Sequence, residues 1–178
     1  MSTDTPTPPD RLRQPTPTAD IARTEIWRRA NVENEHFVCA VVGREGSGKS
    51  GTALSLASAV DPEFSVDRVC FEPADMLRLI DSDGTGSGSA LILDEAGVGL
   101  GSRSWYDQDQ IQLNKTLQTI RDDNQILFLT LPALSELDSQ TVNRLHAYIE
   151  MTTLEEGQQA NFKFKFLHPH AATEDPNP

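Results

Sequence analysis

One lysine and one serine directly after a glycine-rich loop form the clearest chemical pattern in the sequence. Their spacing, Gly43-x-x-x-x-Gly48-Lys49-Ser50, is the Walker A or P-loop pattern. Glycines let successive backbone N–H groups converge on phosphate oxygens, and a following helix adds its partial positive charge. The lysine would reach the β- and γ-phosphates, and the serine hydroxyl would bind Mg²⁺. The pattern predicts a nucleotide site made by Gly43, Glu45, Gly46, Ser47, Gly48, Lys49, Ser50 and Gly51.

Two adjacent carboxylates, Asp94 and Glu95, end the apolar stretch "ALILDE" at residues 90–95. We expect Asp94 to lie beside Mg²⁺ through a water and Glu95 to polarise the attacking water as general base. The blander alternative is a pair of acids that face solvent or cap a turn. A Walker A pattern upstream favours the catalytic interpretation. The prediction is ATP hydrolysis, with Lys49 and Glu95 catalytic and with Ser50 and Asp94 at the metal.

Four further residues are candidates for sensing or neutralising phosphate charge. Thr130 is the last residue but one of the stretch 125–131; it is either a γ-phosphate sensor or a β-branched strand residue, and both interpretations stay open. Arg103, Arg121 and Arg144 are candidate arginine fingers, which neutralise transition-state charge. We favour Arg121 as a catalytic group acting in trans, on the expectation that its helix ends near the sheet edge where nucleotide sites open. This choice predicts a homo-oligomer with ATP at subunit interfaces; the alternative role is a helix-end cation.

Helices and strands must alternate to position these groups. Apolar runs and periodicities predict strands at 36–42, 67–72, 90–95, 125–131, "AYIEMTTL" and "FKFKFL", and helices at 49–60, 73–80, 106–121 and 139–146. Such alternation predicts an α/β fold of three layers, a mostly parallel sheet with helices on both faces. In "FKFKF" the lysines face outward, as on an edge strand. We expect one ATPase domain at 20–168, between a disordered Pro/Thr-rich tail (1–19) and a disordered tail at 169–178.

The composition limits the classes of protein. Among 178 residues the net charge is −12 and lysine is scarce, which suits a high-salt cytoplasm and predicts a halophilic source. A basic face for coating DNA is not expected. No apolar run reaches the roughly 20 residues of a membrane helix, and no signal peptide is recognised, so we expect a cytoplasmic protein without a membrane span. Cys39 and Cys70 fall in predicted strands, where cysteine behaves as a small hydrophobe.

With these residues in place, the chain resembles the additional-strand, catalytic-glutamate ATPases. Within that class it looks most similar to the FtsK–HerA group and to phage assembly ATPases of the zonula occludens toxin-like type, and also to small ATPases of archaeal viruses and plasmids. The resemblance covers roughly residues 36–152 and rests on "GREGSGKS", "LILDEAG" and "LQTIRDDNQILFLTLPALSELDSQTVNRLH". It implies strand order 5-1-4-3-2, assembly into rings or filaments, and ATP-driven movement of a nucleic acid or export of virions.

Three functions compete on these grounds. The first is a nucleic-acid motor or packaging ATPase, for which DNA is a candidate partner and should stimulate hydrolysis. The second is a regulatory or partitioning-type ATPase that acts through protein partners and ignores DNA. The third is a small-molecule kinase, which would place phosphate on another molecule.

Overall fold

A six-stranded sheet forms the centre of the molecule, with strand order β2-β3-β4-β1-β5-β6. The computed structural model describes residues 17–82, 84–96, 103–152 and 162–166. Neighbouring strands are parallel except for β5 and β6, which pair antiparallel. The predicted class and the predicted order 5-1-4-3-2 are confirmed, and β6 is the predicted C-terminal edge strand. The strands are β1 (Phe37–Val42), β2 (Val69–Cys70), β3 (Ala90–Leu93), β4 (Ile126–Leu131), β5 (Ala147–Met151) and β6 (Phe162–Phe166).

The central strands are the apolar runs of the sequence. Every residue of β1, β3 and β4 is buried, as parallel strands covered on both faces require. The register of β1 and β4 runs from Phe37 opposite Ile126 to Val42 opposite Leu131. Because these strands end together, the segments that follow them meet at one edge of the sheet, here called the carboxyl edge. The opposite edge is the amino edge.

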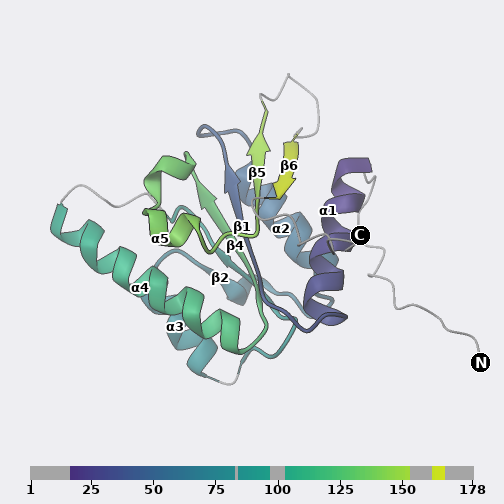
Figure 1. The fold of residues 1–178 in the computed structure, drawn as a ribbon, viewed down its shortest axis with the longest axis horizontal. Coiled ribbons are helices and arrows are strands. Elements are labelled where there is room, and N and C mark those ends of the chain that lie inside the picture. The colour runs from purple at the N-terminus through teal and green to yellow at the C-terminus, as the bar shows by residue number, and fades with distance from the viewer. Residues whose placement is uncertain (1–16, 83, 97–102, 153–161, 167–178) are drawn as a thin grey trace, which may run out of the picture.

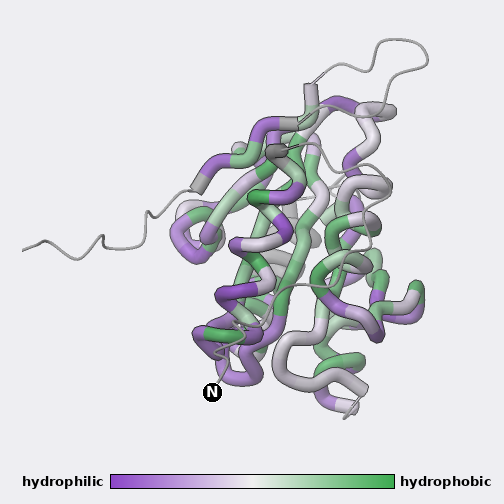
Figure 2. The backbone as a smooth tube through the Cα atoms, turned by 90° about the vertical axis from the view of Figure 1, so that its right-hand side faces the viewer, coloured by the Kyte–Doolittle hydropathy of each residue, from purple (hydrophilic) through white to green (hydrophobic). Residues whose placement is uncertain are grey.

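Helices cover both faces of the sheet. One core cluster joins the sheet to α1 (Pro17–Asn31) and α2 (Lys49–Val60). The other joins it to α3 (Pro73–Asp81) and α4 (Arg103–Asp122), beside the short α5 (Ser139–Val142). Figure 1 shows α1 and α2 on the right of the strands and α3, α4 and α5 on the left. In Figure 2 the strands form the hydrophobic middle of the tube. The fold therefore has the three predicted layers.

Helix α1 was not among the predicted elements. It buries Ala22, Ile26 and Ala30 and includes residues 17–19, which the sequence pattern assigns to the N-terminal tail. Strand β2 has two residues instead of six, and α4 starts three residues before the predicted helix. The predictions for 1–16 and 169–178 lie outside the described residues. No helix in the described ranges is long and apolar enough to cross a membrane.

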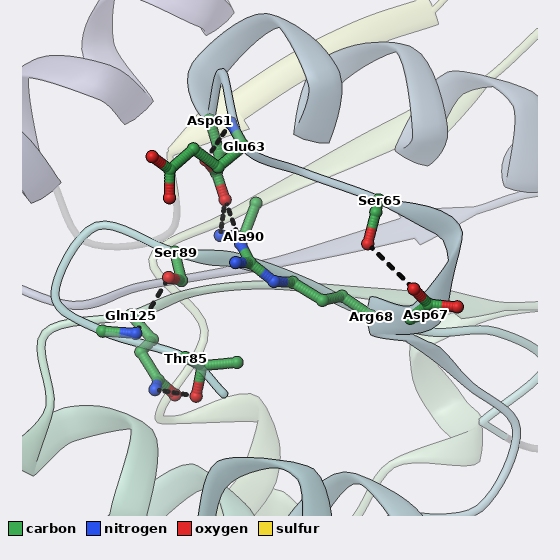
Figure 3. A network of polar contacts seen from close by, with 10 residues as sticks. Asp61, Glu63, Ser65, Asp67, Arg68, Thr85, Ser89, Ala90 and Gln125 are labelled. Atoms are coloured by element: carbon green, nitrogen blue, oxygen red, sulfur yellow. Dashed lines mark hydrogen bonds and ion pairs between the residues drawn. The ribbon is translucent and has the colours of Figure 1, made fainter. Parts of the chain in front are cut away.

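A buried carboxylate, Asp61, joins the end of α2 to the start of β3 (Figure 3). It is 6% exposed, and its oxygens accept from the backbone N–H groups of Glu63 and Ala90 at 2.8 and 2.9 Å. Arg68 forms an ion pair with it at 2.6 Å. A buried charge must be paired and hydrogen-bonded to be tolerated, and here three partners, Glu63, Arg68 and Ala90, meet that need. This cluster fixes where β3, which leads into Asp94 and Glu95, enters the sheet.

Candidate active site

Three segments meet at the carboxyl edge of the sheet. The P-loop follows β1, Asp94 and Glu95 follow β3, and Thr130 lies near the end of β4, between β1 and β3. Side chains alternate across a strand, so Thr130 shares a face with Phe128, and Asp94 continues the face of Ile92. Phe128 and Ile92 belong to the core cluster that contains α2. Thr130 and Asp94 therefore face the helix that begins with Lys49 and Ser50.

The backbone of the P-loop depends on its glycines. Gly46 and Gly48 have φ of 73° and 87°, in the left-handed region that glycine adopts without a Cβ penalty. Gly43 has an ordinary φ but no space for a side chain, because an added Cβ would lie 2.6 Å from Ser47 Oγ and 2.7 Å from Met151 Cβ. Ser47 and Glu45 lie in the turn between these glycines, with Glu45 exposed. The conformation of the loop therefore requires glycine at positions 43, 46 and 48.

The first turn of α2 offers backbone donors toward the loop. Gly48 is the N-cap residue and provides no side-chain cap. The N–H groups of Lys49, Ser50 and Gly51 stand in the first turn, where no carbonyl of the helix itself can accept from them. Lys49 Nζ donates to the carbonyl of Arg44 at 3.0 Å, so the ammonium lies over the same loop. Backbone donors, helix dipole and lysine charge together suit an anion with several oxygens.

Asp94 is the centre of the side-chain hydrogen bonds at this edge. Its Oδ1 accepts from the hydroxyl of Ser50 at 2.9 Å and from the hydroxyl of Thr130 at 2.6 Å. Its own N–H donates to the carbonyl of Cys70 at 2.8 Å. The structure therefore brings together the serine of Walker A and the aspartate of Walker B, as the sequence predicts.

Glu95 stands in a backbone conformation that is unusual for its residue type. Its φ is 54°, a left-handed value that costs a non-glycine residue about 1–2 kcal/mol. Its N–H donates to Thr130 Oγ1 at 2.7 Å, and its side chain is exposed. The bond to Thr130 holds the strained turn in place and directs Glu95 away from the core. Thr130 therefore contacts both acids, the carboxylate of Asp94 and the backbone N–H of Glu95.

The oxygen donors fit a magnesium ion. Mg²⁺ in proteins typically takes one or two protein oxygens and completes its shell with waters and phosphates. The Ser50 hydroxyl donates a hydrogen bond to Asp94. The lone pairs of the Ser50 oxygen therefore stay available to a cation. Asp94 Oδ1 accepts the hydrogen bonds from the Ser50 and Thr130 hydroxyls. A hydroxyl and a carboxylate at this spacing are the donor set that the sequence predicts.

Two of the three candidate arginines, Arg121 and Arg144, lie at the opposite edge of the sheet. Arg121 ends α4 at the amino edge, where it lines a cavity with His36 and Val38, and Arg144 lines the same cavity. A helix that precedes a parallel strand must end where that strand begins, so our expectation that Arg121 emerges near the nucleotide edge was wrong. Figure 1 shows α4 descending to the bottom while the arrow of β5 points up. Arg103 is the first residue of α4, and its side chain lies outside the described structure.

The sequence reasoning also missed a histidine pair at the amino edge. His36 directly precedes β1 and His146 directly precedes β5, and their ring centroids are 4.7 Å apart. His146 Nδ1 accepts from the N–H of Val38 at 3.0 Å. Burial lowers the pKa of His36, and the charges of Arg29 and Arg121 lower it further. The signal was available: His36 is the first residue of the predicted strand 36–42, and His146 directly precedes the predicted strand that starts at residue 147. The starts of parallel strands lie at the same edge of a sheet, so both histidines had to lie there.

Comparisons with known proteins agree with the fold. No protein-family model matches the sequence. The chain is 26% identical over 129 residues to "Uncharacterized protein B-251" of Sulfolobus spindle-shape virus 1, covering 63% of this chain and 51% of that protein. Among solved structures it resembles the FIGL-1 AAA domain in complex with ADP, with TM-score 0.54 and 15% identity over 76% of this chain. The same domain in a second structure gives 0.51.

These matches define the fold and no more. The chain spans about half the length of the viral protein and of the FIGL-1 domain. The N-terminal domain of zonular occludens toxin from Neisseria meningitidis is also similar, at 13% identity over 76% of this chain and 86% of that domain. Its TM-score of 0.47 is too low to support a conclusion. The chain has a P-loop NTPase fold.

Proposed function

We propose that this protein binds ATP with Mg²⁺ at the carboxyl edge and hydrolyses it. One observation carries the proposal: a single oxygen of Asp94 accepts hydrogen bonds from the hydroxyls of Ser50 and Thr130, at 2.9 and 2.6 Å. This oxygen lies beside a glycine-rich loop whose sequence is the Walker A pattern. The ADP bound to the FIGL-1 domain of similar fold supports a nucleotide as the ligand. The resemblance to the additional-strand, catalytic-glutamate class supports Glu95 as the base.

Each residue has a distinct part in the proposed reaction. The N–H groups of the P-loop, among them those of Glu45, Gly46 and Ser47, would orient the phosphates, and Lys49 would exchange its contact with Arg44 for the β- and γ-phosphates. Ser50 and Asp94 would hold Mg²⁺, which would supply positive charge beside the phosphates. Glu95 would accept the proton of the attacking water. Thr130 holds the backbone of Glu95 and one oxygen of Asp94, which fixes the two acids relative to each other.

Two variants test binding and chemistry separately. Lys49→Ala should weaken ATP affinity severely, because the phosphate charge loses its cation; a titration within about threefold of wild type, roughly 0.7 kcal/mol, would contradict the P-loop assignment. Glu95→Gln should keep ATP affinity and lose turnover, because the amide keeps the shape and cannot accept a proton. Turnover within tenfold of wild type would place the base elsewhere.

The target of the ATPase is a further proposal. We favour a nucleic-acid motor or packaging ATPase, which is what the family resemblance implies and which suits a relative from an archaeal virus. Hydrolysis should then rise with single- or double-stranded DNA, measured in molar KCl for a halophilic source. Hydrolysis indifferent to DNA would favour the alternative, a regulatory or partitioning-type ATPase with protein partners. Phosphate found on a third molecule would indicate a kinase.

A homo-oligomer also stays a proposal. Because Arg121 lies at the amino edge, it can reach a nucleotide only in a neighbouring copy. The copies would then be arranged so that the amino edge of one packs on the carboxyl edge of the next. Mixing Arg121→Ala with Glu95→Gln protein should then restore some activity, because one mixed interface has both groups. Activity that is independent of concentration, without rescue on mixing, would leave Arg121 as a helix-end cation.

A further inference from the structure

The amino edge holds a cavity of about 650 Å³ with a basic lining, within the range of small-molecule sites. Arg29 comes from α1, Arg121 from α4 and Arg144 from the segment before β5. The carboxylates of Glu35 and Asp122 also line it, so with neutral histidines its formal charge is +1. The whole chain carries −12. Solubility alone does not explain why three guanidinium groups gather at one place on such an acidic molecule.

The lining supplies donors from three directions. Arg29 is already engaged, since it pairs with Glu35 at 2.7 Å and donates to the carbonyl of His36 at 2.9 Å. Arg121 is exposed, and its guanidinium group forms no hydrogen bond or ion pair within the described part of the chain. Arg144 is exposed and uses one N–H toward the carbonyl of Asn114 at 3.2 Å. Two guanidinium groups therefore keep most of their donors available to a ligand.

We propose that this amino-edge pocket binds a phosphate group, with Arg121 and Arg144 as its principal ligands. The planar fork of arginine matches the spacing of phosphate oxygens and binds them through two parallel hydrogen bonds. His36 also lines the pocket, and the charge of Arg121 contributes to lowering the pKa of His36. The carrier of the phosphate is either a small molecule of nucleotide size or the backbone of a nucleic acid.

The pocket is separate from the proposed ATP site. His36 precedes β1 and the P-loop follows it, so the six residues of β1 set the two sites roughly 20 Å apart. A simpler role for Arg121 is to balance the partial negative charge at the end of α4. That role affects stability and needs no ligand, so binding measurements distinguish the two.

The imidazole of His36 is a local probe for the test. The protein is titrated with inorganic phosphate, with AMP and with a single-stranded oligonucleotide, and His36 is followed by NMR, its signal assigned with His36→Asn. We expect saturable shifts and a raised His36 pKa, because a bound anion offsets the arginine charges. Arg121→Ala and Arg144→Ala should each weaken binding at least about tenfold, about 1.4 kcal/mol. Arg121→Lys should bind more weakly than wild type.

Arg78→Ala is the matched control, since Arg78 is an exposed arginine on α3 paired with Asp75. It should leave the titrations unchanged. Binding of phosphate and AMP identifies a small-molecule site; binding of the oligonucleotide alone, weakening with salt, identifies a nucleic-acid backbone. No His36 response to any of the three probes, or an unchanged response in the folded Arg121→Ala, Arg144→Ala double variant, overturns the proposal. Because His36 lies at the amino edge, this outcome is independent of whether the P-loop binds ATP.

Discussion

Removing the hydroxyl of Thr130 should damage both stability and turnover. Thr130 is fully buried, donates to Asp94 at 2.6 Å and accepts from the N–H of Glu95 at 2.7 Å. Valine keeps the shape and removes both bonds. A bond to a charged group contributes about 1.5–3 kcal/mol, and an unsatisfied N–H costs about 1–3 kcal/mol. We therefore expect Thr130→Val to lose about 3 kcal/mol in total, since the two losses share one site and are not additive.

In a domain of this size, 1 kcal/mol corresponds to about 2–4 °C in Tm, so the expected drop is about 6–12 °C, checked by thermal and urea unfolding. Turnover should fall at least about tenfold with ATP affinity nearly unchanged, because the turn that holds Glu95 at positive φ loses its anchor. Thr130→Ser is the control; it keeps the hydroxyl and loses one buried methyl, which costs about 1 kcal/mol. If valine costs under about 0.5 kcal/mol, or serine is as harmful as valine, the anchoring role is refuted.

Two other perturbations follow from the geometry. Gly43→Ala should destabilise by about 1–3 kcal/mol, because its Cβ would overlap Ser47 Oγ and Met151 Cβ. Gly51→Ala has open space and should not destabilise; equal unfolding midpoints for the two variants would contradict the packing. His36 makes stability depend on pH. Burial, and then the charges of Arg29 and Arg121, lower its pKa from 6.5, so the unfolded chain binds the proton first. Stability should fall as pH drops from 6.5 toward the lower folded pKa, and His36→Gln should reduce that slope in urea titrations.

The contiguous patterns were the predictable part of the molecule. Walker A lies within eight residues, and the apolar runs of β1 and β4 are too uniform to belong to anything but buried strands. Helix α1 was not predicted because its buried face consists of Ala22, Ile26 and Ala30. Two of these residues are small, and charged residues lie between them. Such a stripe has little hydrophobic contrast, and packing against α2 provides the stability that the sequence pattern does not reveal.

Features that join distant segments were harder to predict. The bonds of Thr130 to both acids depend on the pairing of β3 with β4, and the histidine pair depends on the pairing of β1 with β5. The wrong location for Arg121 had a different cause. The expected location followed from which strands are neighbours, whereas the direction of the chain places the end of α4 at the amino edge, where β4 begins.

The position of β1 determines when the chain can finish folding during synthesis. Its partners on both sides come late, since Phe37 pairs with Ile126 and Cys39 with Ala147. Until those segments leave the ribosome, six consecutive apolar residues have unpaired backbone groups on both edges. A chain stopped near residue 120 would still contain β2 and β3, which pair with each other, and an unpartnered β1. Such nascent chains expose a strand suited to aggregation, and pairings this distant in sequence are slow to form.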